Sequence, residues 1–248
     1  MLTKFYAAVV AVAFAAVSTA ALAITADELI AKNVAARGGL AQIRAITSLR
    51  RTGHLILPGA NLDVAVRRTL QRGGKIRDEY TLQGLTQVNA YDGTEAWKID
   101  PFEGRKDPAR MSVDEAKSLI LEGDLDLPLV DYAAKGYNAE YLGTEDVDGT
   151  PTYKLRLRRK SGDQVVYFID PDSYMIIRNV QKQIVRGAEQ ETETDYGEYE
   201  KVAGVYFPST EQSGPKDTDA SQKQEIVFDT AAANEAPAAN YFSFPSGH

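Results

Sequence analysis

The segment from Tyr153 to Val185 constrains the fold more than any other part of the sequence. In its first strand, apolar residues alternate with cations in the order Y-K-L-R-L-R, which places the apolar set on one face. Turns at Ser161-Gly162-Asp163 and Asp170-Pro171-Asp172 separate two further strands, Val165 to Ile169 and Tyr174 to Val185. Because these connections are too short for a crossover helix, the strands run antiparallel. Their apolar face must be covered by another part of the chain.

The first 23 residues have the pattern of a secretory signal peptide. Lys4 precedes an apolar run from Phe5 to about Val17, and Ala21-Leu22-Ala23 is a small-x-small cleavage site. The alternative, an uncleaved anchor helix, is disfavoured because the run is short and rich in alanine. We therefore expect cleavage near Ala23 and a mature chain, residues 24–248, that forms a single domain in the periplasm.

Charge and cysteine content exclude several kinds of site. The sequence has no cysteine, so it contains no disulfide, no thiolate metal site and no thiolate nucleophile. It has 28 basic and 35 acidic residues and a formal net charge of −7. An acidic chain without basic clusters argues against nucleic acid as a partner and against tight docking on anionic membranes.

The mature chain is expected to open with an amphipathic helix. Thr25 to Glu28 is a capping box, and apolar residues then recur at helical spacing from Leu29 to Ile46. Gly38-Gly39 interrupts this pattern and is expected to bend or split the helix.

A second helical cover is expected in the middle of the chain. Ser112 to Glu115 is another capping box, and it begins an apolar stripe that ends near Gly123. The flanking residues Pro101 to Arg110 are expected to form a loop. On the other side, Leu125 to Val130 contains Pro128 and is expected to be an irregular covering segment.

The remaining sequence is typical of strands separated by turns. We therefore expect a mainly β domain: a half-open antiparallel β-barrel, or strongly curved sheet, of about ten or eleven strands covered by amphipathic helices. Within it, one strand has acidic residues at period two, which predicts a solvated face, with a cation site as the alternative. These residues are Glu189, Glu191, Glu193 and Asp195.

No catalytic motif stands out. The two histidines, His54 and His248, are isolated, and there is no H-E-x-x-H, no G-x-S-x-G and no glycine-rich phosphate loop. Asp124 and Asp126 could pair as catalytic carboxylates, but carboxylates beside glycine are more common in solvated turns. We predict no enzymatic activity, no metal and no cofactor.

Several short motifs together resemble a known family. After the signal peptide come A-A-R-G-G-L (Ala35 to Leu40), Y-D-G-x-x-x-W (Tyr91 to Trp97) and K-G-Y (Lys135 to Tyr137). Further along the chain come D-G-x-x-x-Y-K-L (Asp148 to Leu155), Y-x-x-x-x-G-V-x-x-P (Tyr199 to Pro208) and N-x(7)-F-x-x-P (Asn234 to Pro245). In this order, over nearly the whole mature chain, they resemble the periplasmic outer-membrane lipoprotein-sorting proteins, which have the LolA-like fold.

The resemblance implies a half-open β-barrel whose mouth is plugged by helices and whose apolar concavity holds acyl chains. It also implies an internal arginine, for which Arg50 and Arg51 are candidates by their place early in the first strand. The partners would be an acyl lipid or lipoprotein cargo and membrane-bound donor and acceptor proteins, and we expect a monomer.

We predict which residues form the cavity. The cavity wall would consist of Val64, Val66, Tyr80, Trp97, Leu155, Leu157, Tyr167 and Ile169. A lid made by Val113, Leu119 and Ile120 would close over it and yield to acyl chains. The alternatives are that the wall residues are ordinary core and that the short helix is a fixed seal. If Trp97 lines the cavity, its fluorescence should respond to an acyl ligand.

These features predict a soluble carrier that binds acyl chains and moves them through the aqueous envelope space. The second hypothesis is an envelope protein-binding sensor on the same scaffold. A structural envelope protein or an unrecognised hydrolase is the third. The cargo can be a lipoprotein, a free lipid or another amphiphile.

Overall fold

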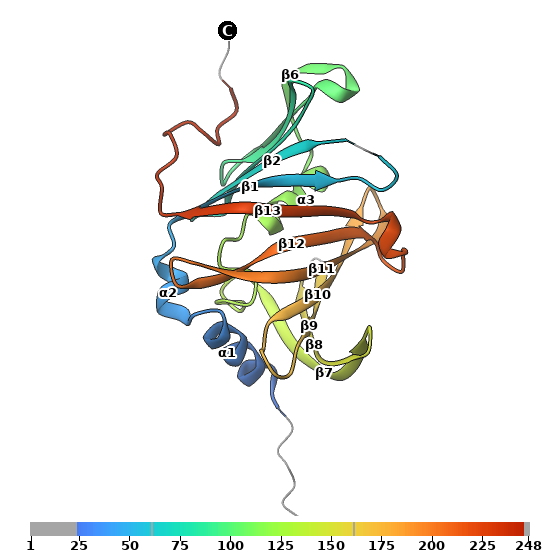
Figure 1. Cartoon of the computed structure of the whole chain (residues 1–248). Helices are drawn as coiled ribbons and strands as arrows, with labels where there is room; N and C mark the ends of the chain where they lie inside the picture. The colour runs from blue at the N-terminus through green and yellow to red at the C-terminus, as the bar shows by residue number, and fades with distance from the viewer. Residues whose placement is uncertain (1–23, 61, 161, 246–248) are drawn as a thin grey trace, which may run out of the picture.

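The computed structural model describes residues 24–60, 62–160 and 162–245 (Figure 1). The predicted signal peptide, Ser161 of the first predicted turn and His248 lie outside these ranges. The signal peptide and the single domain over residues 24–248 therefore stay predictions. None of the helices within the described ranges combines the length and the apolar character needed to cross a membrane.

One antiparallel sheet dominates the described part of the chain. It has thirteen strands there, in the order β6-β5-β4-β3-β2-β1-β13-β12-β11-β10-β9-β8-β7. The strands are β1 (Ser48–Ile56), β2 (Val64–Gln71), β3 (Lys75–Leu82), β4 (Leu85–Tyr91), β5 (Ala96–Asp100), β6 (Arg105–Arg110), β7 (Tyr137–Val147), β8 (Thr150–Arg159), β9 (Gln164–Ile169), β10 (Ile176–Val185), β11 (Ala188–Val202), β12 (Val205–Pro215) and β13 (Gln224–Ala233). The mainly β class and the open, curved sheet are confirmed, as is the antiparallel meander of β8, β9 and β10.

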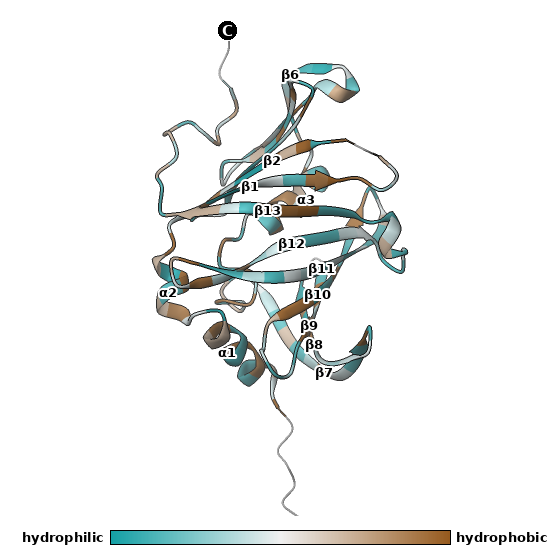
Figure 2. Ribbon diagram, viewed as in Figure 1, coloured by the Kyte–Doolittle hydropathy of each residue, from teal (hydrophilic) through white to brown (hydrophobic). Residues whose placement is uncertain are grey.

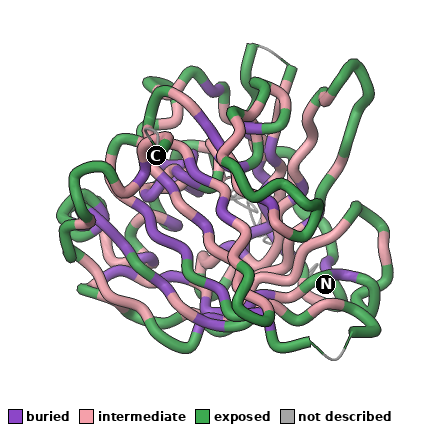
Figure 3. Tube along the Cα trace, turned by 90° about the horizontal axis from the view of Figure 1, so that it is seen from above, coloured by how far each residue is buried: buried purple, intermediate pink, exposed green. Residues whose placement is uncertain are grey.

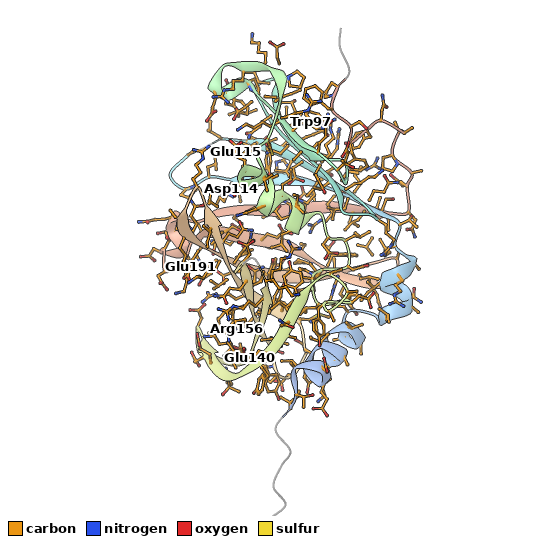
Figure 4. All side chains as sticks on the ribbon, turned by 180° about the vertical axis from the view of Figure 1, so that it is seen from behind. Trp97, Asp114, Glu115, Glu140, Arg156 and Glu191 are labelled. Atoms are coloured by element: carbon orange, nitrogen blue, oxygen red, sulfur yellow. The ribbon has the colours of Figure 1, made fainter. Side chains whose placement is uncertain are left out.

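The order of the strands explains why a helix covers the sheet. From β1 to β6 and from β7 to β13, each strand pairs with its neighbour in sequence, and the two halves join where β1 pairs with β13. The strands β6 and β7 therefore lie at opposite edges, and the chain between them must pass over one face. We call residues 111–136, which make this passage, the crossing segment. It contains α3 (Val113–Glu122), which lies across the sheet in Figure 4.

The three helices begin where the sequence predicts. Both capping boxes form: the Thr25 hydroxyl accepts from the backbone of Glu28, and the Ser112 hydroxyl accepts from Glu115. The opening helix is split into α1 (Ala26–Ala36) and α2 (Leu40–Ala45). Gly38, between them, has φ +121°, and a Cβ there would lie 2.2 Å from the carbonyl oxygen of Gly204. Only glycine permits this close approach.

Two apolar clusters lie on the face of the sheet that carries the helices. The first joins Ile43 of α2 and Leu119 of α3 to strand residues such as Ile76. The second joins Leu29 of α1 to Leu155 and other residues of the meander. Hydrophobic and hydrophilic residues alternate along the strands in Figure 2, and buried and accessible residues alternate in Figure 3, as expected for a sheet with one covered face.

Two local predictions are wrong. Residues 101–110 were expected to form a loop, but they contain a short 3₁₀ helix, Pro101–Glu103, and the edge strand β6. An edge strand tolerates Pro108, because its outer side needs no ladder hydrogen bond. The acidic row of β11 is only partly solvated: Glu193 is buried, and Lys223 donates to it at 2.6 Å. β12 and β13 bring this lysine to β11, which period two cannot show.

Candidate functional site

A cavity of about 280 Å³ lies between the two apolar clusters, under α3. Its volume is just below the range of roughly 300–1,000 Å³ typical of small-molecule sites. From α3, Ser118, Leu121 and Glu122 face it at spacings of three and four residues, which is one side of a helix. Leu125 and Leu127, from the irregular part of the crossing segment, extend this cover.

Part of the wall formed by β10, β11 and β12 carries polar, uncharged side chains. Asn179, Thr194 and Ser213 stand side by side, because Asn179 pairs with Thr194 and Thr194 with Ser213. The hydroxyls of Thr194 and Ser213 are 2.8 Å apart, and Asn179 Nδ2 donates to the Tyr196 hydroxyl at 2.6 Å. Each hydroxyl has one donor and two acceptor positions, so this wall can also hydrogen-bond a guest.

A cluster of buried charges closes one end of the cavity. Arg68 donates to Asp78 at 3.0 Å, to Glu211 at 2.8 Å and to Glu122 at 2.9 Å. Arg51 donates to the other oxygen of Glu211 at 2.9 Å. Two guanidiniums thus face three carboxylates, and both cations are paired.

These neighbours shift the pKa values of the two glutamates in opposite directions. Burial raises the pKa of Glu122 to about 7; Arg68 opposes this shift, and the carboxylate of Asp78 adds to it. Glu122 keeps 43% of its side-chain surface accessible, and it lines the cavity. Burial also acts to raise the pKa of Glu211, but Arg68 and Arg51 outweigh it, so that pKa is lowered. The charge of Glu122 can therefore change near neutral pH, whereas Glu211 is held ionised by its two arginines.

Another buried arginine, Arg37, lies elsewhere in the lining. It follows α1, is 3% exposed, and donates to the backbone oxygen of Asp126 at 3.1 Å. Its guanidinium lies 5.7 Å from the centre of the Phe207 ring. Burial lowers the pKa of Arg37.

The structure places the predicted wall residues in three settings. Tyr80 and Tyr167 line the cavity. The other apolar residues of the prediction except Trp97 are buried in the core and do not line it. They are Val64, Val66, Leu155, Leu157 and Ile169. Their contact with an acyl chain stays a prediction that requires the cavity to widen.

Trp97 lies on the opposite face of the sheet, which corrects the prediction that it faces inward. Paired residues share a face, and Trp97 pairs with Ala90, which pairs with Arg77. Arg77 alternates with Ile76 and therefore points away from the cavity side. Trp97 Nε1 donates to the carbonyl oxygen of Phe242 at 2.8 Å. In Figure 4 it lies at the β5–β6 end of the molecule, far from Glu140 and Arg156 at the other end.

The predicted lid residues also separate. Leu119 belongs to the first apolar cluster, and Ile120 packs against that cluster. Val113 is 80% exposed, which corrects its assignment to the covering face. The buried stripe begins at Ala116, so the first turn of α3 extends past the cluster. Whether the helix moves stays a prediction.

The sequence reasoning missed the charged part of the site, although a signal was present. At period two, Arg68 falls on the same face as Val66 and Leu70, and Asp78 on the same face as Ile76 and Tyr80. A charge in an apolar row indicates a buried partner. Of the two candidates for an internal arginine, Arg51 is buried at the cavity, whereas Arg50 is on the other face with Glu235.

Similarity to known proteins is found in the structure and not in the sequence. No family model matches the sequence, and no curated protein matches it. An outer membrane lipoprotein-sorting protein domain from Vibrio parahaemolyticus is 14% identical with a TM-score of 0.56, over 88% of this chain and 96% of that one. A DUF1329 family protein from Desulfovibrio piger is 14% identical (TM-score 0.58; 88% and 97% covered), and a LolA superfamily protein from Nitrosomonas europaea is 13% identical (0.57; 88% and 98%). The chain has the LolA-like fold.

Proposed function

We propose that the protein is a periplasmic carrier, which holds the acyl chains of a lipid or lipoprotein under α3 and moves them through the aqueous envelope space. The observation that carries this proposal is the cavity between the sheet and the crossing segment. Two similar structures, described as a lipoprotein-sorting domain and a LolA superfamily protein, support it through their common fold.

Binding of this kind needs apolar surface and no catalytic group. Burial of an acyl chain is worth about 0.8 kcal/mol per methylene. A cavity of about 280 Å³ admits only part of a long chain, so the cover must move. The crossing segment can do so without breaking a ladder hydrogen bond, because α3 lies outside the sheet.

Lipid extraction tests the proposal directly. The full chain, secreted by its own signal and purified without detergent, should carry acyl lipid near one equivalent in mass spectrometry of the extract. Protein that carries no lipid and binds none of the added amphiphiles used below would contradict the carrier function.

A matched pair of substitutions on β11 places the binding site. Thr194→Trp inserts an indole into the cavity and should reduce the lipid content and the affinity at least about tenfold, a loss of about 1.4 kcal/mol. Glu189→Trp inserts the same group on the opposite face of the same strand, where Glu189 is exposed, and should leave both unchanged. Circular dichroism checks that both variants are folded. Equal binding by the two variants would place the lipid elsewhere.

A further inference from the structure

Arg37 differs from the other buried arginines in having no carboxylate partner. The arginines buried in the described ranges are Arg37, Arg51 and Arg68. The last two form ion pairs with carboxylates, whereas Arg37 forms none within the described residues and donates to a backbone oxygen. The nearby carboxylates are already paired, Asp126 with Arg72 at 2.6 Å and Asp124 with Lys135 at 2.7 Å.

This arrangement is costly for the protein alone. A buried charge that lacks a counter-ion loses hydration without gaining an equivalent interaction. Replacement of a buried ionic group by an apolar one of similar size is often neutral or stabilising. Folding by itself therefore does not explain a guanidinium at this position, and its place in the cavity lining suggests a role in binding.

Tyr167 supplies a second donor at the same cavity. Its side chain is 3% exposed, and its hydroxyl forms no hydrogen bond with another described residue. Burial raises its pKa, so the hydroxyl stays protonated and can donate, and it lines the same cavity as Arg37. Tyr199, also in the lining, instead donates to the backbone oxygen of Ile176 at 2.7 Å.

The free donors of Arg37 and Tyr167 face the cavity. Within the described residues, the side-chain nitrogen and oxygen atoms that are both inaccessible and without a hydrogen-bond partner belong to Asn33, Arg51 and Gln164. The remaining donors of Arg37 and Tyr167 thus keep accessible surface, although each residue is 97% buried, and that surface lies in the cavity they line.

Of the buried arginines in the lining, Arg37 is the one best placed to bind an anion. At the charged cluster, three carboxylates surround two paired guanidiniums, which repels an anion. Leu121 of α3, with Leu125 and Leu127 that follow it, offers apolar contact in the same lining.

We propose that Arg37 and Tyr167 form a head-group subsite for an amphiphile with one singly charged oxyanion, with its acyl chain against Leu121, Leu125 and Leu127. The inference rests on the proposed carrier function and specifies its ligand. A planar guanidinium matches the geometry of a carboxylate or phosphodiester, and a single guanidinium balances a single charge.

Calorimetric titration of the delipidated full chain tests this with three probes that share a twelve-carbon chain. They are laurate, 1-lauroyl-lysophosphatidylglycerol and the uncharged 1-lauroylglycerol. One of the two anions should bind at least about tenfold more tightly than the uncharged ester, and the tighter anion identifies a carboxylate or a phosphodiester as the head. Arg37→Met should bring this ratio close to one. Arg50→Met removes the same charge from the other face and should leave the ratio unchanged.

The outcomes separate the two proposals. Uncharged ester that binds as well as both anions would overturn the head-group subsite and leave the carrier function standing. No binding of any probe would overturn the subsite, and it would overturn the carrier function as well if the purified protein also carried no lipid. If Arg37→Met does not fold, the ratio measured for the native chain still decides, together with Tyr167→Phe. That variant should weaken the tighter anion several-fold and leave 1-lauroylglycerol unchanged, and an unchanged anion affinity would count against the subsite.

Discussion

At the scale of single residues, the members of the charged cluster at the cavity differ in how strongly their neighbours fix their charge. Arg68 contacts three carboxylates, and these raise its pKa against the opposing effect of burial. Removing one member of such a buried cluster typically costs about 3–5 kcal/mol, because the other charges lose their partner. Glu122 is one of the members that line the cavity, and its pKa of about 7 makes its charge depend on pH under ordinary conditions.

Glu122→Gln should therefore change the pH dependence of stability. In the folded chain the pKa of Glu122 is about 7, above its ordinary value of 4.5, so the native state binds this proton more tightly than the unfolded state. Its contribution is fully present below about pH 4.5 and is lost as pH rises through 7. In urea unfolding, the unfolding free energy of the variant minus that of the parent chain should therefore increase from pH 5 to pH 8.

The groups around Glu122 stay the same in this variant, and an exposed glutamate provides a control. The charged groups that influence the pKa of Glu122 are Arg68, Asp78, Glu211 and Arg51. They are the same in both proteins, so the difference in unfolding free energy isolates Glu122. Glu103→Gln removes an equal charge from an exposed position and should show no such trend. A stability difference for Glu122→Gln that is the same at both pH values would show that this carboxyl does not titrate in the range.

At the scale of elements, the crossing segment is held more weakly than the strands. α3 has ten residues, and a helix of this length is marginal without its packing partners. Besides the pair of Glu122 with Arg68, its polar contacts include the end of β10 and the turn after it: Lys117 donates to the Ile184 carbonyl, and Asp114 accepts from the Arg186 backbone at 2.9 Å. The strands of the meander, by contrast, are paired on both sides.

Hydrogen exchange should show this difference. Amides of residues 111–130 should exchange faster than those of β8 and β9 in the lipid-free protein, because they can open without global unfolding. A bound amphiphile should slow residues 111–130 selectively, while β8 and β9 serve as the internal reference. Exchange as slow as in β9, with no effect of ligand, would show that α3 is a fixed seal.

At the scale of the whole molecule, residues 234–245 pack on the face of the sheet opposite the helices. After β13 pairs with β1, residues 234–245 pass over the first strands. Ser48 donates to the Glu235 carbonyl at 2.6 Å, and Trp97 donates to the Phe242 carbonyl. Phe244 packs edge-on against Trp97 at 6.2 Å between ring centres. The tryptophan is thus buried by the tail rather than by a ligand.

Phe242→Ala should accordingly destabilise the protein and expose its tryptophan. Phe242 is 3% exposed, and truncation of a buried phenylalanine costs about 3–5 kcal/mol. Chemical unfolding should show this loss, and Trp97 emission should shift to longer wavelength. Phe102→Ala, at a residue 45% exposed, should change stability by no more than about 0.5 kcal/mol. An acyl ligand should leave Trp97 emission unchanged, and a ligand-dependent change would contradict its placement on the outer face.

The local parts of this protein could be predicted from its sequence. The antiparallel meander, both capping boxes, the split at Gly38 and the mainly β class depend on spacing and turn residues within a few positions of one another. Such patterns fix which side chains of one strand share a face, and they led to Tyr80 and Tyr167 in the cavity lining.

Features that depend on pairing between distant strands were decided only by the tertiary structure. The alternation of side chains along one strand does not show which face of β5 lies on the same side of the sheet as a given face of β2, so Trp97 was placed on the wrong side. The strand β6 was not predicted, because only its pairing with β5 makes it a strand. The charged cluster depends on β1, β2, β3, β12 and α3 meeting in space. The register between distant strands, and the path of the chain from one sheet edge to the other, determine these contacts, and neither is encoded in local spacing.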